Sequence, residues 1–321
     1  MTSPEEAPAN LAPPSLPSGR FWPMDEREWL AERFEEQRGH LRSVAYRMLG
    51  SLPEADDALQ DAWLRVSRAG AGDVENVGGW LTTIVARVCL NMLRSRNRRR
   101  ETPFEAGFPE PVITPHGQLQ PEEEALLADS VRLALLIVLD TLTPAERIAF
   151  VLHDMFELPF GEIGPMVGRS PEAARQLASR ARRRVKGAAV PEPDPNLGRE
   201  REVVEVFLAA SRGGDLDALV AVLDPDVVLR ADFGPRRRPQ VLRGVAAVAE
   251  QAHAYRHLAA GADVRRALVN GAPGGVILAR GRPFAIMAFT VRDGRIVEID
   301  AIEDPERVAR LAAGLLETTP S

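Results

Sequence analysis

The chain has 321 residues, 45% apolar residues and a formal net charge of −6 at pH 7, so we expect two or three globular domains. Its single cysteine, Cys89, excludes an intramolecular disulfide and a cysteine-rich zinc site. No apolar run is long enough to span a bilayer, and no signal-peptide pattern opens the chain, so we expect a cytoplasmic protein without membrane attachment. The acidic net charge argues against a nucleic-acid partner. However, arginines cluster at 94–100 and 169–186, and the local distribution of charge is a better guide to nucleic-acid binding than the net charge.

The first hundred residues contain a tail and three helical patterns. Residues 1–23 are rich in proline, alanine and serine and are predicted to be a disordered tail. A long helix follows from Met24 to Gly50, and Ser51 begins a second one whose outer face carries Asp56, Asp57, Gln60 and Asp61. Acidic residues favour a helix N-terminus, but Asp61 lies two turns in, beyond the reach of that effect. This face therefore predicts a partner surface.

The third helical pattern, residues 79–94, combines an aromatic, an amide and arginines on one face. Trp80, Thr83, Arg87, Asn91 and Arg94 recur at spacings of three and four. Such a face suits a nucleic-acid strand, whose bases stack and whose backbone is anionic. Spacing alone leaves Trp80 open: it is either a core residue or a platform for an opened base.

Residues 142–186 read as a helix-turn-helix. Thr143 and Glu146 form a capping box around Pro144, and Gly168 with Ser170 marks a turn into a last helix. Pro165 predicts that the middle helix is short or kinked. The last helix has a stripe of small apolar residues and an opposite face of Arg175, Gln176, Ser179, Arg180, Arg182, Arg183 and Lys186. This pattern is typical of a recognition helix in the major groove; the alternative is a solvated basic helix.

The final third changes character after a proline-rich linker at 189–198. Helical patterns near 203–208 and 215–223 come first, then a strand pattern at 226–232 and a helical pattern at 244–258. Strand patterns follow at 264–269, 275–280, 284–291 and 296–302. Asp293-Gly294 predicts a hairpin turn. The sequence therefore predicts an α+β cone over residues 199–317.

The run Asp56 to Trp63, then Gly79-Trp80-Leu81, then Arg87 and Asn91, followed by a helix-turn-helix, resembles bacterial extracytoplasmic-function sigma factors. The resemblance implies two all-α domains, residues 24–101 and 122–188, whose partners are core RNA polymerase and promoter DNA. It implies that Asp56, Asp57, Gln60 and Asp61 bind polymerase. The residues implied to contact the minus-ten element are Asn76, Trp80, Thr83, Arg87, Asn91 and Arg94. Those implied to contact the minus-thirty-five element are Ser170, Glu172, Arg175, Gln176, Ser179, Arg180, Arg182, Arg183 and Lys186.

The linker at 102–121 contains Phe108, Pro109, Glu110 and Pro111 and, taken alone, is an irregular spacer. It also resembles a motif of the sigma-factor subgroup that carries a C-terminal SnoaL-like cone. Asp304, Pro305 and Arg307 resemble that subgroup's terminal motif, and residues 232–236 loosely resemble its glycine-rich motif. The resemblance implies a regulatory contact between the cone and the linker. The inducing effector, a small molecule or a protein, is not identified by the sequence.

Two alternatives remain. The cone could bind or convert a small molecule, with general acid or base candidates Asp232, His253, His257, Asp300 and Glu303. His253 and His257 lie one turn apart, but two histidines without a third ligand predict a surface pair rather than a metal site. A repressor that uses only the helix-turn-helix would leave the first domain unexplained. We expect no catalytic activity, metal or cofactor.

Overall fold

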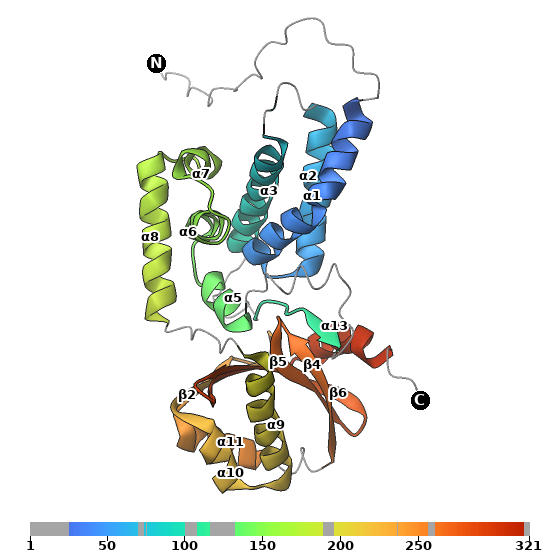
Figure 1. The fold of residues 1–321 in the computed structure, drawn as a ribbon, viewed down its shortest axis with the longest axis vertical. Helices are drawn as coiled ribbons and strands as arrows, with labels where there is room; N and C mark the ends of the chain where they lie inside the picture. Colours follow the sequence, from blue (N-terminus) through green and yellow to red (C-terminus); the bar gives the residue numbers. More distant parts are fainter. Residues whose placement is uncertain are drawn as a thin grey trace, which may run out of the picture.

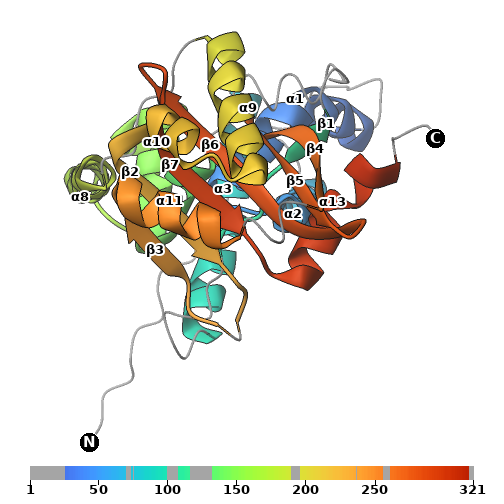
Figure 2. The same ribbon diagram turned by 90° about the horizontal axis from the view of Figure 1, so that it is seen from below.

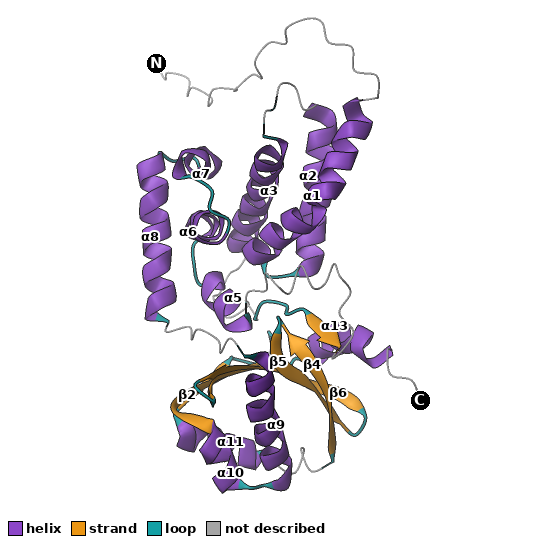
Figure 3. Ribbon diagram, in the orientation of Figure 1, coloured by secondary structure: helices purple, strands orange, loops and turns teal. Residues whose placement is uncertain are grey.

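The computed structural model describes residues 26–69, 74, 76–99, 108–115, 132–188, 196–235, 237–255 and 261–317. Two groups of helices lie side by side on top of a curved sheet, whose opposite face holds further helices (Figure 1, Figure 3). No helix among the described residues is long and apolar enough to cross a membrane.

The first helical domain consists of α1 (Glu26–Leu49), α2 (Leu52–Ala69) and α3 (Val77–Arg99). Gly50 ends α1 with a φ of +78°, a conformation that favours glycine because it lacks a Cβ atom. The three helices pack around apolar residues at helical spacing, including Leu41, Leu59 and Leu81. The disordered tail predicted at 1–23 lies outside the described residues.

The second helical domain consists of α5 (Leu133–Asp140), α6 (Pro144–Phe150), a π-helical turn (Val151–Met155), α7 (Phe160–Val167) and α8 (Pro171–Gly187). The Thr143 capping box is present, and the Ser170 hydroxyl accepts the Ala173 N–H and so begins α8. α7 is short, as Pro165 predicts, and ends at Gly168 in the left-handed conformation. The helix predicted from residue 121 is described only from Leu133.

The two helical domains share one hydrophobic core, which the sequence did not predict. α3 lies between α1 and α2 on one side and α6 and α7 on the other (Figure 1). Ala86, Cys89 and Leu93 on α3 are therefore buried together with the expected Leu81 and Val85.

A buried arginine joins the two domains. Arg147 of α6 is 1% exposed and donates to the Arg47 carbonyl at 3.3 Å and to Asp140 at 2.8 Å. Burial lowers the pKa of Arg147 to about 10, while Asp140 opposes that effect, so the guanidinium stays charged at neutral pH. Phe156, just after the π-helical turn, lies edge-on to His40 and under the guanidinium of Arg47 on α1.

The C-terminal part is the predicted α+β cone. It contains α9 (Leu197–Gly213), α10 (Leu216–Val222), α11 (Val245–Ala254) and α13 (Pro305–Glu317). Its sheet has the order β1-β4-β5-β6-β7-β2-β3, antiparallel except for the parallel pair β2 and β7. The strands are β1 (Ile113–Pro115), β2 (Leu223–Asp232), β3 (Gln240–Arg243), β4 (Ala262–Val269), β5 (Ala272–Ala279), β6 (Arg282–Arg292) and β7 (Arg295–Ile302).

Each face of the sheet packs against different elements. α9, α10 and α11 fill the concave face around Phe207 and Phe289, as the view from below shows (Figure 2). The other face packs against α13 and against α5 of the second helical domain, with Leu133 among the buried residues. The cone and the helical domains are therefore in contact through the sheet itself.

One edge strand of this sheet comes from the predicted linker. The reading of residues 102–121 as an irregular spacer is wrong at 113–115, because these residues form β1 and pair with β4. A three-residue strand that ends at a proline carries too little periodicity to be predicted from sequence. β3 was not predicted either, because its four residues also carry too little periodicity.

Candidate functional surfaces

The predicted recognition helix α8 lies at the outer edge of the molecule (Figure 1). Its small residues Ala174, Ala178 and Ala181 are fully buried against α6 and α7. The opposite face is open to solvent, and it exposes Glu172, Arg175, Gln176, Arg180, Arg183 and Lys186, with Ser179 and Arg182 half-buried. The helix therefore presents donors and positive charge outward, as a groove reader requires.

Several predicted contact residues of α8 also hold their own domain. The Ser170 hydroxyl caps the helix, and Arg182 donates to Asp154 at 2.5 Å. The Arg175 guanidinium lies 5.4 Å from the centre of the Phe160 ring. Gln176, Arg183 and Lys186 have no such contact among the described residues and are the least constrained for DNA.

The predicted nucleic-acid face of α3 is partly engaged within the helix. The Asn76 side chain accepts the Gly79 N–H at 3.0 Å, and the Thr83 hydroxyl donates to the Gly79 carbonyl at 2.9 Å. Arg87, Asn91 and Arg94 are exposed along the helix. Trp80 is half-buried against the shared core, so its indole has both an apolar contact and an open side.

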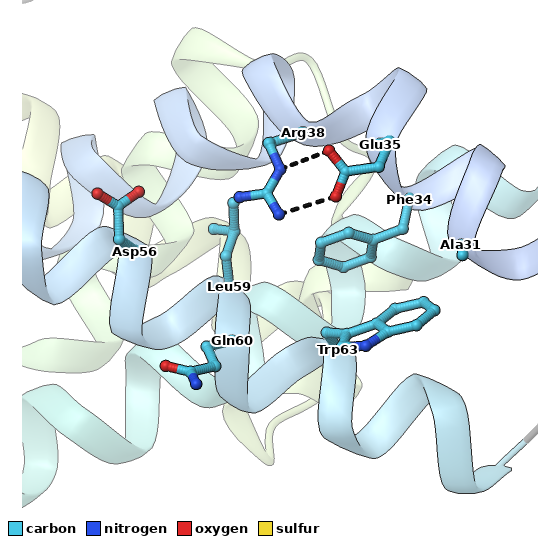
Figure 4. A pocket seen from close by; sticks show the side chains of 8 residues that line it. All are labelled: Ala31, Phe34, Glu35, Arg38, Asp56, Leu59, Gln60 and Trp63. Atoms are coloured by element: carbon cyan, nitrogen blue, oxygen red, sulfur yellow. Dashed lines mark hydrogen bonds and ion pairs between the residues drawn. The ribbon is translucent and has the colours of Figure 1, made fainter.

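The acidic face of α2 borders a groove of about 330 Å³ between α1 and α2 (Figure 4). Two of the four predicted polymerase-binding residues, Asp56 and Gln60, line it. Its floor is aromatic, because the Phe34 and Trp63 rings lie 5.3 Å apart, and Arg38 forms a bidentate pair with Glu35 at its rim. Trp63 is half-buried, so one side of its ring is open to the groove.

The four predicted polymerase-binding residues are all exposed, but they differ in their ion pairs. Asp56 accepts two hydrogen bonds from Arg42, at 2.7 and 2.8 Å, and Asp61 pairs with Arg65 one turn away. Asp57 makes no ion pair with the described residues. Exposed pairs of this kind contribute little to stability, so the carboxylates remain available to a basic partner.

The segment Phe108–Val112, which we call the junction segment, runs between the first helical domain and the cone. On the helical side, the Glu110 N–H donates to the Gly50 carbonyl at 2.7 Å, and the Ser51 hydroxyl donates to the Glu110 carboxylate. The Tyr46 hydroxyl lies 3.1 Å from the Glu110 carbonyl and 3.0 Å from Asn270 Oδ1 in the cone. Burial raises the pKa of Tyr46, so its hydroxyl remains a donor.

The cone holds the same segment through two nodes. The first is Asn270 at the β4–β5 turn, whose Oδ1 accepts the Val112 N–H at 2.7 Å and whose own N–H donates to the Val112 carbonyl at 2.8 Å. The second is Asp232, which is 1% exposed and accepts from the Phe108 N–H at 2.7 Å and from Arg307 at 2.5 Å. Arg307 also donates to the Phe108 carbonyl at 2.5 Å.

The remaining residues predicted for a regulatory contact lie at this second node. Pro109 and Pro111 are buried in the junction segment. The Asp304 carboxylate accepts the Arg307 N–H at 2.8 Å and so begins α13, where Pro305 occupies the first position. Asn270 and Tyr46 are junction residues that the sequence did not reveal, since their partners lie 64 to 224 positions away.

The catalytic candidates of the cone are dispersed. Asp232 is engaged at the junction, and Asp300 points to the outer face of the sheet, where it pairs with Arg230 at 2.9 Å. Among the candidates that the structure describes, Glu303 alone lines the cavity of about 120 Å³ on the concave side. His257 lies outside the described residues, so the predicted His253–His257 pair has no described geometry.

Comparison with known proteins assigns the helical part. Residues 34–99 match the family model described as Sigma-70 region 2, and residues 132–185 match Sigma-70, region 4. The chain is 38% identical over 295 residues to ECF RNA polymerase sigma factor SigJ of Mycobacterium tuberculosis, which covers 85% of this chain and 91% of that protein. This chain belongs to the ECF sigma factors of RNA polymerase. The first helical domain is thus region 2, and the second is region 4.

The similarity to other ECF sigma factors extends through the cone. Probable ECF RNA polymerase sigma factor SigI of M. tuberculosis is 33% identical over 296 residues, covering 91% of this chain and 99% of that protein. The crystal structure of M. tuberculosis SigJ superposes with a TM-score of 0.68 at 34% identity, covering 86% of this chain and 97% of that one. As a sigma factor, the protein binds core RNA polymerase and directs initiation at promoters.

Proposed function

We propose that the cone holds regions 2 and 4 of this sigma factor in a closed form that cannot engage a promoter, and that loosening the junction segment permits initiation. The observation that carries this proposal is the junction segment itself. Residues Phe108–Val112 connect the two DNA-reading domains in sequence, and hydrogen bonds from both region 2 and the cone hold them.

The packing of region 4 on region 2 supports a closed form. The minus-ten and minus-thirty-five elements are named for positions about 25 base pairs apart, which is roughly 85 Å of B-form DNA at about 3.4 Å per base pair. In the structure Arg147 of region 4 donates to a carbonyl of region 2. Domains in direct contact cannot reach both elements, so they must separate before initiation.

Within the open form we assign the exposed faces as the sequence predicts. The α2 face with Asp56, Asp57, Gln60 and Asp61 binds polymerase, the α3 face from Trp80 to Arg94 contacts the minus-ten element, and α8 reads the minus-thirty-five element. Exposure of these faces supports the assignment. We place the protein in the cytoplasm, where polymerase and DNA are found, and give the cone a regulatory rather than a catalytic role.

Run-off transcription with core polymerase tests the proposal. A chain that ends at Asp304 loses α13 and with it Arg307, so we expect more transcript than from the full-length protein. A chain that ends at Lys186 loses the cone altogether, and its amount of transcript should change further. Circular dichroism must first show that its helices are intact, because Leu133 is buried against the cone. Equal transcription by all three chains would show that the cone does not regulate initiation.

A further inference from the structure

The cone contains a cavity, partly open to solvent, that neither the junction segment nor the DNA-reading helices use. It has a volume of about 120 Å³ and is bounded by α9, α11 and strands β2, β4, β5, β6 and β7. Apolar side chains form most of its wall: Phe207, Leu208, Leu229, Val264, Ile277, Phe284 and Met287. An apolar cavity of about 150 Å³ accommodates benzene, so this one suits a molecule of about benzene's size or slightly smaller.

Polar groups gather at one end of this cavity. The Glu303 carboxylate lines it and accepts a hydrogen bond from the Tyr255 hydroxyl at 3.3 Å through Oε2. Burial raises the pKa of Glu303, while Tyr255 and the charge of Arg237 oppose that rise. Ser211 and Arg212 also line the cavity, but each donates to a backbone carbonyl of its own helix. Gln251 and Tyr255 line the cavity as well, but among the described lining residues Glu303 brings the carboxylate, the strongest acceptor for a ligand hydroxyl.

We propose that this cavity binds a small alcohol or phenol, with the apolar body between β5, β6 and α11 and the hydroxyl donating to Glu303. An apolar wall with one convergent acceptor is the usual design of a small-molecule site. A hydrogen bond to a carboxylate in such surroundings is stronger than one between neutral groups. An anionic ligand is disfavoured, because it would place its charge beside Glu303.

Glu303 is also directly connected to the junction. Its N–H donates to the Asp232 carbonyl at 2.7 Å, and the next residue, Asp304, begins α13 and accepts the Arg307 N–H. Gly234, with a φ of +80°, packs so closely on Asp304 that a Cβ atom there would overlap the carboxylate. A ligand that displaces Glu303 therefore disturbs Asp232 and Arg307, the residues that hold Phe108.

We infer that ligand binding at Glu303 favours release of the junction segment. This second half rests on the proposed function, whereas the binding half does not. A ligand shifts such an equilibrium only if it binds one form more tightly. The cavity must therefore bind its ligand better when the junction is released.

Calorimetric titration of the full chain with phenol tests the binding half. We expect saturable binding at one site, with benzene bound about tenfold more weakly because it lacks the hydroxyl. Glu303→Gln should weaken phenol binding about tenfold, since the charge-assisted bond is lost. Two cavity-filling variants from different elements, Ala301→Leu and Ala252→Leu, should abolish binding. The matched control is Ala221→Leu, because Ala221 is exposed on α10 and does not line the cavity.

Each of the following outcomes would refute one part of the inference. No saturable phenol binding, or equal binding by both filled variants and the control, would refute the cavity as the site. Benzene binding as tightly as phenol would refute the alcohol class. Run-off transcription by the full chain should rise with phenol, and Ala301→Leu should not respond; phenol that binds without this effect would refute the coupling. The chain ending at Asp304 separates a failure of the coupling from a failure of the proposed function. The proposed function predicts that this chain gives more transcript than the full-length protein without any ligand.

Discussion

Arg307 and Arg310 lie one turn apart on α13, yet their surroundings differ. The Arg307 side chain is 15% exposed and pairs with buried Asp232, whereas the Arg310 side chain is 58% exposed and pairs with Glu110. Removing one partner of a buried ion pair leaves the other charge unpaired and away from water. In an exposed pair, water solvates the remaining charge, so the loss costs little.

We therefore predict that Arg307→Gln destabilises the cone by about 3 kcal/mol, because the buried Asp232 carboxylate loses its ion-pair partner. Arg310→Gln, the matched control on the same helix, should cost less than about 1 kcal/mol. Urea unfolding of the two variants measures the difference. Similar losses for both would show that Asp232 is not held by Arg307.

On α8 the position along the helix separates two kinds of DNA-facing residue, because the N-terminal part of a recognition helix contacts base edges. Arg175→Ala should cost about 1–3 kcal/mol of binding at one promoter position and relax specificity there. Lys186→Ala should weaken binding evenly across sequences and reduce the salt dependence, because Lys186 is an exposed cation near the helix end. Competition binding to a library of minus-thirty-five sequences at two salt concentrations checks both. Indistinguishable profiles would refute this division of roles.

At the scale of elements, local signals predicted most of what was found. The Thr143 box, the Ser170 cap and the Gly168 stop set helix ends by contacts within four residues, so sequence alone located them. The burial of Ala86, Cys89 and Leu93 could not be predicted, because the residues that pack against them belong to region 4, in a distant part of the chain. The same holds for β1 and for the Asn270 node, whose partners are set by tertiary packing.

The candidate sites divide in the same way. The exposed faces of α2 and α8 follow from helical periodicity, and the structure leaves them open to solvent. Asp232 and Asp300 were grouped as cavity acids, but their strand positions place them at the junction and on the outer face. A strand's alternation gives two faces, and sequence does not say which of them lines a cavity.

The α2 face yields a prediction about the polymerase. Reversing the charge at Asp57 and Asp61 should weaken binding to core polymerase, because both carboxylates are exposed on one helix face. The fold should remain intact, since the only pair lost among the described residues is the exposed Asp61–Arg65 pair. A pull-down with core enzyme measures the effect, with Asp217→Lys on exposed α10 as the control. Unchanged binding would mean that this face is merely solvated.

The outer face of β7 carries a pH-sensitive cluster. Glu298 and Asp300 share Arg230, and burial raises the pKa of both carboxyls. An acid with a raised folded-state pKa favours the folded state at low pH, and that advantage is lost as pH rises from the unfolded value of about 4.3 through the folded one. Glu298→Gln should therefore gain stability relative to the natural chain as pH rises. Urea unfolding at mildly acidic and mildly alkaline pH measures the difference in unfolding free energy between the variant and the natural chain. A difference that does not change with pH would contradict the prediction.

At the scale of the whole molecule, three contacts produce one compact arrangement. Region 4 packs on α3 of region 2, the junction segment is held between region 2 and the cone, and α5 packs on the outer face of the sheet. We propose that the first of these contacts must break in a promoter complex, where regions 2 and 4 bind separate elements. In our proposal the cone acts on the spacing of the DNA readers, because the outer face of α8 and the arginines of α3 stay exposed.

The separation between regions 2 and 4 is the most direct test of this closed form. Fluorophores at Arg68 of α2 and Glu162 of α7, both exposed, would report it by energy transfer once Cys89, the only native cysteine, is replaced by alanine. We predict high transfer in the free full-length protein, lower transfer in the chain ending at Asp304, and a near loss of transfer in the promoter complex, where the elements lie roughly 85 Å apart. Low transfer in the free protein, or high transfer that persists in a transcribing complex, would contradict the account.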